Sequence, residues 1–337
     1  MLAFSPRPEA ARPYEIADRV EDGLRTFRLT YRPPRIPGPG LIAARRGALD
    51  ILGRLRDEGF VPEVVHGHIF LSGPAALPAA RRSDAALVIQ ENLTRVTERQ
   101  LGRGERALAR YVYRRADLVC PNNARLERAV KELGAAATKT MPNVLDAEFT
   151  LRPRQRKDGA VRAINVASLH DKKGHAYLLG AVVAARETEP GLTLDLVGDG
   201  PLRGELEDQV RELGLEDVVT FHGFEPHERV AELLAHSDLL VLSSLRENQP
   251  LVVAEAMASG LPTVGTDVGG VPEMLEGGAG VVVPPADADA LARAIVEVSR
   301  GLDGYAPEAL ARLARERYGP ESVARRWGET YSELVSP

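Results

Sequence analysis

Short apolar runs alternate with longer amphipathic runs along the second half of the chain. From residue 160 onward, runs of strand length rich in Val, Leu and Ile are each followed, after a short turn, by a run of helix length. The successive pairs are VRAINVAS and HAYLLGAVVAARE, LTLDLVG and PLRGELEDQVREL, VVTFHG and PHERVAELLAH, DLLVLSS and PLVVAEAMAS, PTVGT and VPEMLE, and GVVVPP and DALARAIVEVS. This order predicts an α/β, Rossmann-like domain in which helices cover both faces of a parallel sheet.

The first half shows a similar but less regular alternation. It contains PEVVHGH with SGPAALPAARR, AALVIQ with ERALARYVYRR, and ADLVC with ARLERAVKEL. The polar, basic segment LRPRQRKDGA (151–160) separates the halves and has the composition of a linker. We therefore predict two Rossmann-like domains, residues 1–150 and 151–319. A terminal helix over 320–337 carries Trp327 and Tyr331 on one face, and packing against the first domain is one position open to it.

Length and composition agree with two folded domains in a reducing compartment. A chain of 337 residues, 44% of them hydrophobic and 27% charged, exceeds what one core usually serves. Cys120 is the single cysteine, so an internal disulfide is excluded. The sequence has no signal-peptide pattern and no run of about 18 apolar residues. We expect a cytoplasmic protein whose membrane contact, if any, is peripheral.

Charge is distributed unequally between the two halves. Residues 1–150 hold 24 basic against 18 acidic side chains, and residues 151–337 hold 19 against 30. A basic half suits nucleic acid, an anionic membrane surface or a phosphorylated acceptor, while a solvated arginine-rich surface is an equal alternative.

Two carboxylates eight positions apart bracket a predicted helix start. Glu247 follows the strand DLLVLSS, and Pro250 stands where a helix would begin. Glu255 then lies about one turn inside that helix. The free N–H groups at a helix start bind phosphate, whereas carboxylates beside them repel phosphate and suit hydroxyl groups. An acid, a helix start and a second acid match the sugar, diphosphate and ribose of a sugar nucleotide.

The chain resembles retaining glycosyltransferases of the two-domain GT-B class, in the family 4-like group marked by two glutamates with seven residues between them. The motifs that carry this resemblance occur in the family's order from Pro62 to the C-terminus. They are VVHGH, PNV (142–144), NVASLHDKKG, LVGDGPL, VTFHGF, SDLLVLSS, ENQPLVVAEAMASGLP and TDVGGVPE.

The resemblance implies roles for individual residues of a donor site. Glu247 would bind hydroxyls of the donor sugar, Glu255 those of the ribose, and Lys173 would neutralise the departing diphosphate. The remaining donor-site residues that it implies are Ser168, Gly223, Phe224, Asn248, Gln249, Pro250, Leu251 and Val252, of which the last three would present backbone amides. Solvation of Lys172 and Lys173, and a surface position for Glu255, are the structural alternatives.

The resemblance further implies a metal-independent reaction without a cofactor other than the substrate nucleoside-diphosphate sugar. In the retaining mechanism the leaving phosphate oxygen takes the acceptor's proton. His66 and His68 lack an evident third metal ligand, so an acceptor-side or structural role is favoured over a metal site. Asn92 joins them as an acceptor-side candidate. The expected acceptor is a polysaccharide, a cell-envelope glycan or a lipid-linked glycan.

Three departures from the family pattern keep a second hypothesis open. Ser168 stands where the family usually has an arginine, which Arg246 or Lys172 could replace. Asn92 stands where a histidine is common. The family's opening strand, glycine-rich loop and helix do not precede MLAFSPRP, which resembles its second strand. Either the true start lies upstream or this half is rearranged, and the alternative function is a catalytically impaired or non-catalytic nucleotide-sugar-binding subunit.

Arginines recur at steps of three and four between residues 95 and 115. This spacing aligns Arg95, Arg99, Arg103, Arg106, Arg110 and Arg114, although GRG (102–104) is expected to interrupt the helix. Such a face can bind anionic lipid headgroups. A solvated helix in which Glu98 and Glu105 pair with the arginines is the alternative. Nucleic-acid binding is not expected, because no aromatic platform accompanies the basic residues.

Overall fold

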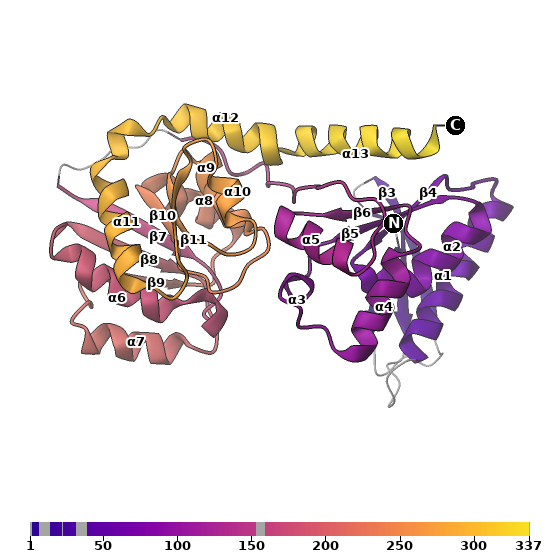
Figure 1. Ribbon diagram of the computed structural model, residues 1–337, viewed down its shortest axis with the longest axis horizontal. Coiled ribbons are helices and arrows are strands. Elements are labelled where there is room, and N and C mark those ends of the chain that lie inside the picture. Colours follow the sequence, from indigo (N-terminus) through magenta and orange to yellow (C-terminus); the bar gives the residue numbers. More distant parts are fainter. Residues whose placement is uncertain (1, 7–13, 22, 32–38, 153–158, 337) are drawn as a thin grey trace. The chain divides into compact units, whose positions relative to one another are not determined.

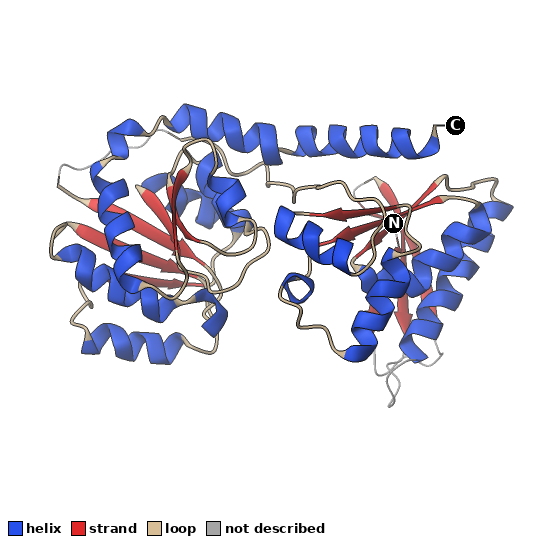
Figure 2. Ribbon diagram, in the orientation of Figure 1, coloured by secondary structure: helices blue, strands red, loops and turns tan. Residues whose placement is uncertain are grey.

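The computed structural model describes residues 2–6, 14–21, 23–31, 39–152 and 159–336. The chain divides into two compact units. Unit 1 comprises residues 1–121, 126–140 and 328–337, and unit 2 comprises 122–125 and 141–327. Each unit is an α/β structure (Figures 1 and 2).

Unit 1 contains two small sheets. In the first, β3 (Leu24–Tyr31) pairs in parallel with β1 (Leu2–Pro6) and antiparallel with β2 (Tyr14–Glu21). The second is parallel, in the order β4 (Val64–His68), β5 (Ala86–Glu91) and β6 (Leu118–Pro121). The helices of unit 1 are α1 (Pro39–Asp57), α2 (Gly73–Ser83), α3 (Thr94–Thr97) and α4 (Arg103–Tyr113). Most of α5 (Ala124–Glu132) also lies in unit 1. The apolar face of the second sheet packs on α2, α4 and α5 around the buried Ile89 and Tyr113.

Unit 2 is built on a six-stranded parallel sheet in the order β12-β11-β10-β7-β8-β9. The strands are β7 (Val161–Val166), β8 (Leu192–Val197), β9 (Val219–Gly223), β10 (Leu239–Leu242), β11 (Thr263–Thr266) and β12 (Gly280–Val283). The helices are α6 (His175–Arg186), α7 (Arg203–Glu212), α8 (His227–His236), α9 (Leu251–Ala258), α10 (Val271–Leu275), α11 (Ala288–Arg300), α12 (Pro307–Tyr318) and α13 (Pro320–Val335). The predicted β and α alternation of this half agrees with this order.

Two apolar cores lie on opposite faces of the sheet of unit 2. One joins the sheet to α6, α7 and α11, and the other joins it to α8, α9, α10 and α12 (Figure 1). Strand β10 is buried at every position because both its faces are covered. The chain order reverses between β7 and β10, and ligands of open parallel sheets bind at the carboxyl ends of the strands beside such a reversal.

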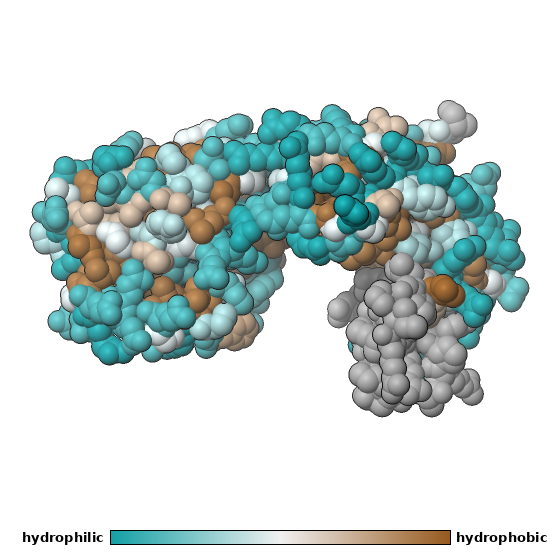
Figure 3. Space-filling model, turned by 60° about the horizontal axis from the view of Figure 1, so that its bottom comes forward, coloured by the Kyte–Doolittle hydropathy of each residue, from teal (hydrophilic) through white to brown (hydrophobic). Residues whose placement is uncertain are grey.

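The end of α13 belongs to unit 1. The hydroxyl of Tyr331 lies 2.6 Å from Nδ1 of His66, and Lys139 forms an ion pair with Glu333. No helix in the described part of the chain is long and apolar enough to span a bilayer. On the face drawn in Figure 3, hydrophobic residues form separate patches within a mainly hydrophilic surface.

Candidate functional site

The loops that follow β7 and β10 are joined by hydrogen bonds at the carboxyl edge of the sheet. The amide of Leu245 donates to the carbonyl of Lys172 at 2.7 Å, and Ser243 Oγ donates to the carbonyl of Lys173 at 2.9 Å. Gly174 permits this approach, because it has a φ of 66° and a Cβ there would collide with the carbonyl oxygen of Ser243. Gly174 therefore allows the loop that carries Lys172 and Lys173 to lie against the end of β10.

This contact brings Lys173 and Glu247 together in an ion pair. Lys173 Nζ donates to Glu247 Oε1, and Ser244 Oγ donates to the same oxygen at 2.8 Å. The two side chains are only 16% and 13% exposed. Each charge is compensated by the other, so loss of either partner would leave a largely buried charge unpaired. The predicted diphosphate ligand and the predicted sugar ligand are thus direct neighbours.

The segment after Glu247 is held by contacts within unit 2. The carbonyl of Asn248 accepts from the amide of Gly270 at 2.6 Å. Gln249 uses both ends of its amide: Oε1 accepts from the backbone of Asn143 at 2.6 Å, and Nε2 donates to the backbone carbonyl of Asn122 at 2.9 Å. In the structure, therefore, Gln249 fixes the approach to α9 through backbone contacts.

Helix α9 begins at Leu251 without a side-chain cap. Pro250 precedes it with φ −70° and ψ 111°, and it donates no hydrogen bond of its own. The first-turn amides of Leu251 and Val252 lie at the positive end of the helix dipole. This is the type of helix start that binds an anion.

Glu255 lies one turn into α9 and is partly buried. Within the described residues its carboxyl accepts no hydrogen bond. Burial raises the pKa of its carboxyl to about 7; nearby His227 opposes this rise in pKa and Asp146 adds to it. His227 Nδ1 itself lies 3.4 Å from Asp146. A partly buried carboxylate without donors is suited to receive the hydroxyls of a diol.

The other predicted donor-site residues follow neighbouring strands. Ser168 is exposed two residues after β7, and Gly223 ends β9, where its carbonyl accepts from the amide of Gly198 at 2.7 Å. Phe224 follows and is 84% exposed. Arg246, also exposed, belongs to the loop bonded to Lys172.

The acceptor-side candidates all lie in unit 1. The rings of His66 and His68 stack with centroids 4.8 Å apart, and burial together with the neighbouring His68 lowers the pKa of His66 to about 4. Both histidines line a hollow of about 740 Å³ that Phe27, Ile51 and other apolar residues also line. Within the described residues, no cluster of three or more His, Cys, Asp or Glu side chains could hold a metal ion.

Glu91 organises the loop that carries Asn92, although the sequence motifs did not single it out. Its buried carboxyl accepts from the amides of Phe70, Asn92 and Leu93 at 3.0 Å each and from the Tyr113 hydroxyl at 2.6 Å. A carboxylate at the end of the apolar strand ALVIQE was the available signal.

Comparisons with known proteins give consistent matches. Residues 147–315 match the family model "Glycosyl transferases group 1", and residues 1–143 match "Glycosyl transferase 4-like domain". A glycogen synthase of Mycobacterium tuberculosis is 30% identical over 272 residues, which cover 77% of this chain and 65% of that protein. A putative colanic acid biosynthesis glycosyltransferase of Salmonella typhimurium, WcaL, is 28% identical over 273 residues, covering 77% and 66%. The chain thus spans about two thirds of the length of these relatives.

Solved structures resemble the whole fold. HepE of Anabaena in complex with UDP has a TM-score of 0.75 and 21% identity, covering 92% of this chain and 86% of that chain. Sucrose-phosphate synthase of Thermosynechococcus elongatus has a TM-score of 0.75 and 22% identity, covering 99% and 88%. These neighbours confirm the predicted GT-B fold. Because the group 1 model matches half of the sequence, this chain belongs to the glycosyl transferases group 1 family.

Proposed function

We propose that this chain is a retaining, metal-independent glycosyltransferase of the two-glutamate type. It moves a sugar from a nucleoside-diphosphate sugar to a polysaccharide, cell-envelope or lipid-linked acceptor. The observation that carries the proposal is the Lys173–Glu247 ion pair in the loops that precede the uncapped start of α9. HepE, which resembles the chain in fold, has been solved with UDP and with UDP-glucose, and WcaL is named as a putative colanic acid biosynthesis glycosyltransferase.

Each end of the donor has a matching group in unit 2. The amides of Leu251 and Val252 would bind the diphosphate, and the Glu255 carboxylate would accept hydrogen bonds from the ribose hydroxyls. When the donor binds, its diphosphate becomes a second anionic partner for Lys173, in addition to Glu247. Glu247 can then accept hydroxyls of the sugar while Ser244 still donates to it. The buried charges thus keep partners when the donor binds.

The proposed reaction needs no protein base. The bond between the anomeric carbon and the diphosphate oxygen breaks, and the acceptor oxygen forms its bond to the same face of that carbon. The departing phosphate oxygen takes the acceptor's proton. Lys173 and the start of α9 stabilise the negative charge that develops on the diphosphate, which is the work that a divalent cation would otherwise do. The exposed cations Lys172 and Arg246 belong to the same joined loops.

A binding screen followed by turnover tests this function. We expect one of UDP-, GDP- or ADP-glucose to raise the melting temperature, because a ligand that binds only the folded state stabilises it. The stabilising donor is then incubated with glycan and lipid-diphosphate acceptors in the presence of EDTA, and the anomeric proton of the product is followed by NMR. Retained configuration in EDTA supports the proposal, while inverted product or activity that EDTA abolishes contradicts it. Stabilisation without transfer or hydrolysis would favour a non-catalytic subunit.

A further inference from the structure

An exposed row of arginines lies along α4, outside the donor site. Arg103, Arg106 and Arg110 in α4 and Arg114 at its C-cap are spaced by three, four and four residues, so they share one face of the helix. All four are exposed. The buried side chains of α4, Ala109, Val112 and Tyr113, pack into the core of unit 1 beside this row.

The acids near this row are already paired with other arginines. Glu105 accepts two hydrogen bonds from Arg95, at 2.9 and 2.6 Å, and one from the amide of Gly102. Glu132 accepts from Arg99 through both oxygens, at 2.8 and 2.9 Å. No ion pair joins an acid of the described ranges to any of the four arginines of the row. Pairing with neighbouring acids therefore describes Arg95 and Arg99, whereas the four arginines of the row are exposed.

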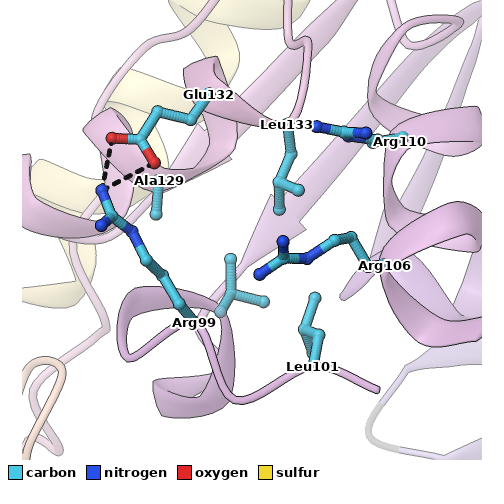
Figure 4. A pocket seen from close by; sticks show the side chains of 8 residues that line it. Arg99, Leu101, Arg106, Arg110, Ala129, Glu132 and Leu133 are labelled. Atoms are coloured by element: carbon cyan, nitrogen blue, oxygen red, sulfur yellow. Dashed lines mark hydrogen bonds and ion pairs between the residues drawn. The ribbon is translucent and has the colours of Figure 1, made fainter. Parts of the chain in front are cut away.

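Two hollows flank the middle of the row. The first, of about 330 Å³, has Arg106 and Arg110 on one side and the Arg99–Glu132 pair opposite, as Figure 4 shows. Val96, Leu101, Ala129 and Leu133 give it an apolar lining. The second, of about 400 Å³, is lined by Arg106, Arg110 and other arginines together with Tyr111. Arg106 and Arg110 thus present guanidinium groups to two concave surfaces.

From this arrangement we infer that the α4 face, comprising the four arginines of the row, Tyr111 and Arg115, docks on the anionic phospholipid headgroups of a membrane. Planar guanidinium groups bind phosphate through paired hydrogen bonds. Tyr111 is 46% exposed, and the Arg115 guanidinium lies 4.0 Å from the centre of its ring. An amphipathic aromatic side chain among arginines suits the boundary between headgroups and acyl chains. Like charges at these spacings repel one another on an isolated helix, and an anionic surface removes that cost.

Vesicle co-sedimentation of the full chain tests the docking face. Wild-type protein should bind vesicles of phosphatidylcholine with phosphatidylglycerol and not vesicles of phosphatidylcholine alone. Binding should weaken between about 50 and about 500 mM NaCl, because salt screens surface charge. The double variant Arg106→Gln/Arg110→Gln should bind about 30-fold more weakly, since each arginine near such a surface contributes roughly fivefold.

The control is Arg293→Gln/Arg312→Gln, which removes the same charge from exposed positions on α11 and α12 of unit 2. It should bind vesicles like the wild type. Equal losses in the two double variants, or no binding to phosphatidylglycerol at low salt, would overturn the inference. Tighter arginine-dependent binding to a labelled oligonucleotide than to vesicles would also overturn it, in favour of a nucleic acid partner. Thermal stabilisation by the sugar nucleotide should be unchanged in both variants, so the result is independent of the donor site.

Discussion

Replacing Glu255 by glutamine should stabilise the folded chain, and the gain should grow with pH. Burial raises the pKa of the Glu255 carboxyl from 4.5 to about 7. The folded state therefore holds this proton more tightly than the unfolded state. The free energy of unfolding falls as the pH rises from the unfolded-state pKa of 4.5 to the folded-state pKa of about 7. A pKa shift of this size lowers the free energy of unfolding of the wild type by about 1 kcal/mol near pH 5 and by roughly 3 kcal/mol near pH 8. Glutamine has nearly the same shape and never bears the charge.

Urea unfolding followed by circular dichroism measures this difference. Glu255→Gln should have a higher free energy of unfolding than the wild type at both pH values. This difference should be roughly 2 kcal/mol larger at about pH 8 than at about pH 5. Glu216→Gln, at an exposed acid of the same unit, should show no such trend. A difference between Glu255→Gln and wild type that is equal at both pH values would refute the reasoning.

The same carboxyl should give donor binding a matching pH dependence. Hydroxyl donors favour the ionised form, whose population rises about tenfold between pH 6 and pH 8 for a pKa near 7. Wild-type affinity for the stabilising sugar nucleotide, measured by calorimetry, should rise by up to that factor. Glu255→Gln should bind weakly at both pH values. Flat wild-type affinity would remove the ribose role of Glu255.

Lys173→Ala should lower kcat by about 10²–10³ in a donor-turnover assay, because it removes a preorganised cation at the departing diphosphate, whereas Lys172→Ala should have a smaller effect; a near-normal kcat for Lys173→Ala would contradict the assignment. Gly174→Ala should lower the free energy of unfolding by roughly 2–4 kcal/mol, because the new Cβ would meet the Ser243 carbonyl and residue 174 has a positive φ. Gly204→Ala, at a position with open space around it, should cost nothing when unfolding is measured in the same way. Glu91→Gln should lower stability by roughly 1–3 kcal/mol, because an amide cannot accept all four hydrogen bonds of the carboxylate, and a melting temperature like that of wild type would show that the loop does not depend on them.

The sequence pattern predicts unit 2 well because its strands β10 and β11 are buried on both faces. Continuous apolar runs such as LLVL in β10 stand out against the amphipathic helices that follow them. The start of α9 was also predictable, since proline is favoured at the beginning of a helix and glycine after its end. The small sheet of β1, β2 and β3 was harder, because its antiparallel strand β2 has mostly polar, exposed residues and lacks an apolar run.

Contacts set by strand order could not be predicted from the pattern. The Lys173–Glu247 pair exists because β7 and β10, which are distant in sequence, are neighbours in the sheet. Hydropathy along the chain does not encode which strands pair. For the same reason the contact between His66 and Tyr331, which are 265 positions apart, could not be predicted. Nor could the set of four groups that donate hydrogen bonds to Glu91.

The Lys173–Glu247 pair is better explained by ligand binding than by stability. A largely buried ion pair contributes little net free energy, because desolvation of both charges offsets their attraction, and apolar residues of similar size would hold the two loops together as well. Its advantage appears when a donor that carries both an anionic diphosphate and neutral hydroxyls arrives. The lysine can turn to the diphosphate and the glutamate to the hydroxyls without either charge losing all its partners. We therefore expect Lys173→Met/Glu247→Leu to fold as stably as the wild type in urea unfolding while losing stabilisation by the sugar nucleotide, and a large loss of stability would mean that the pair serves the fold instead.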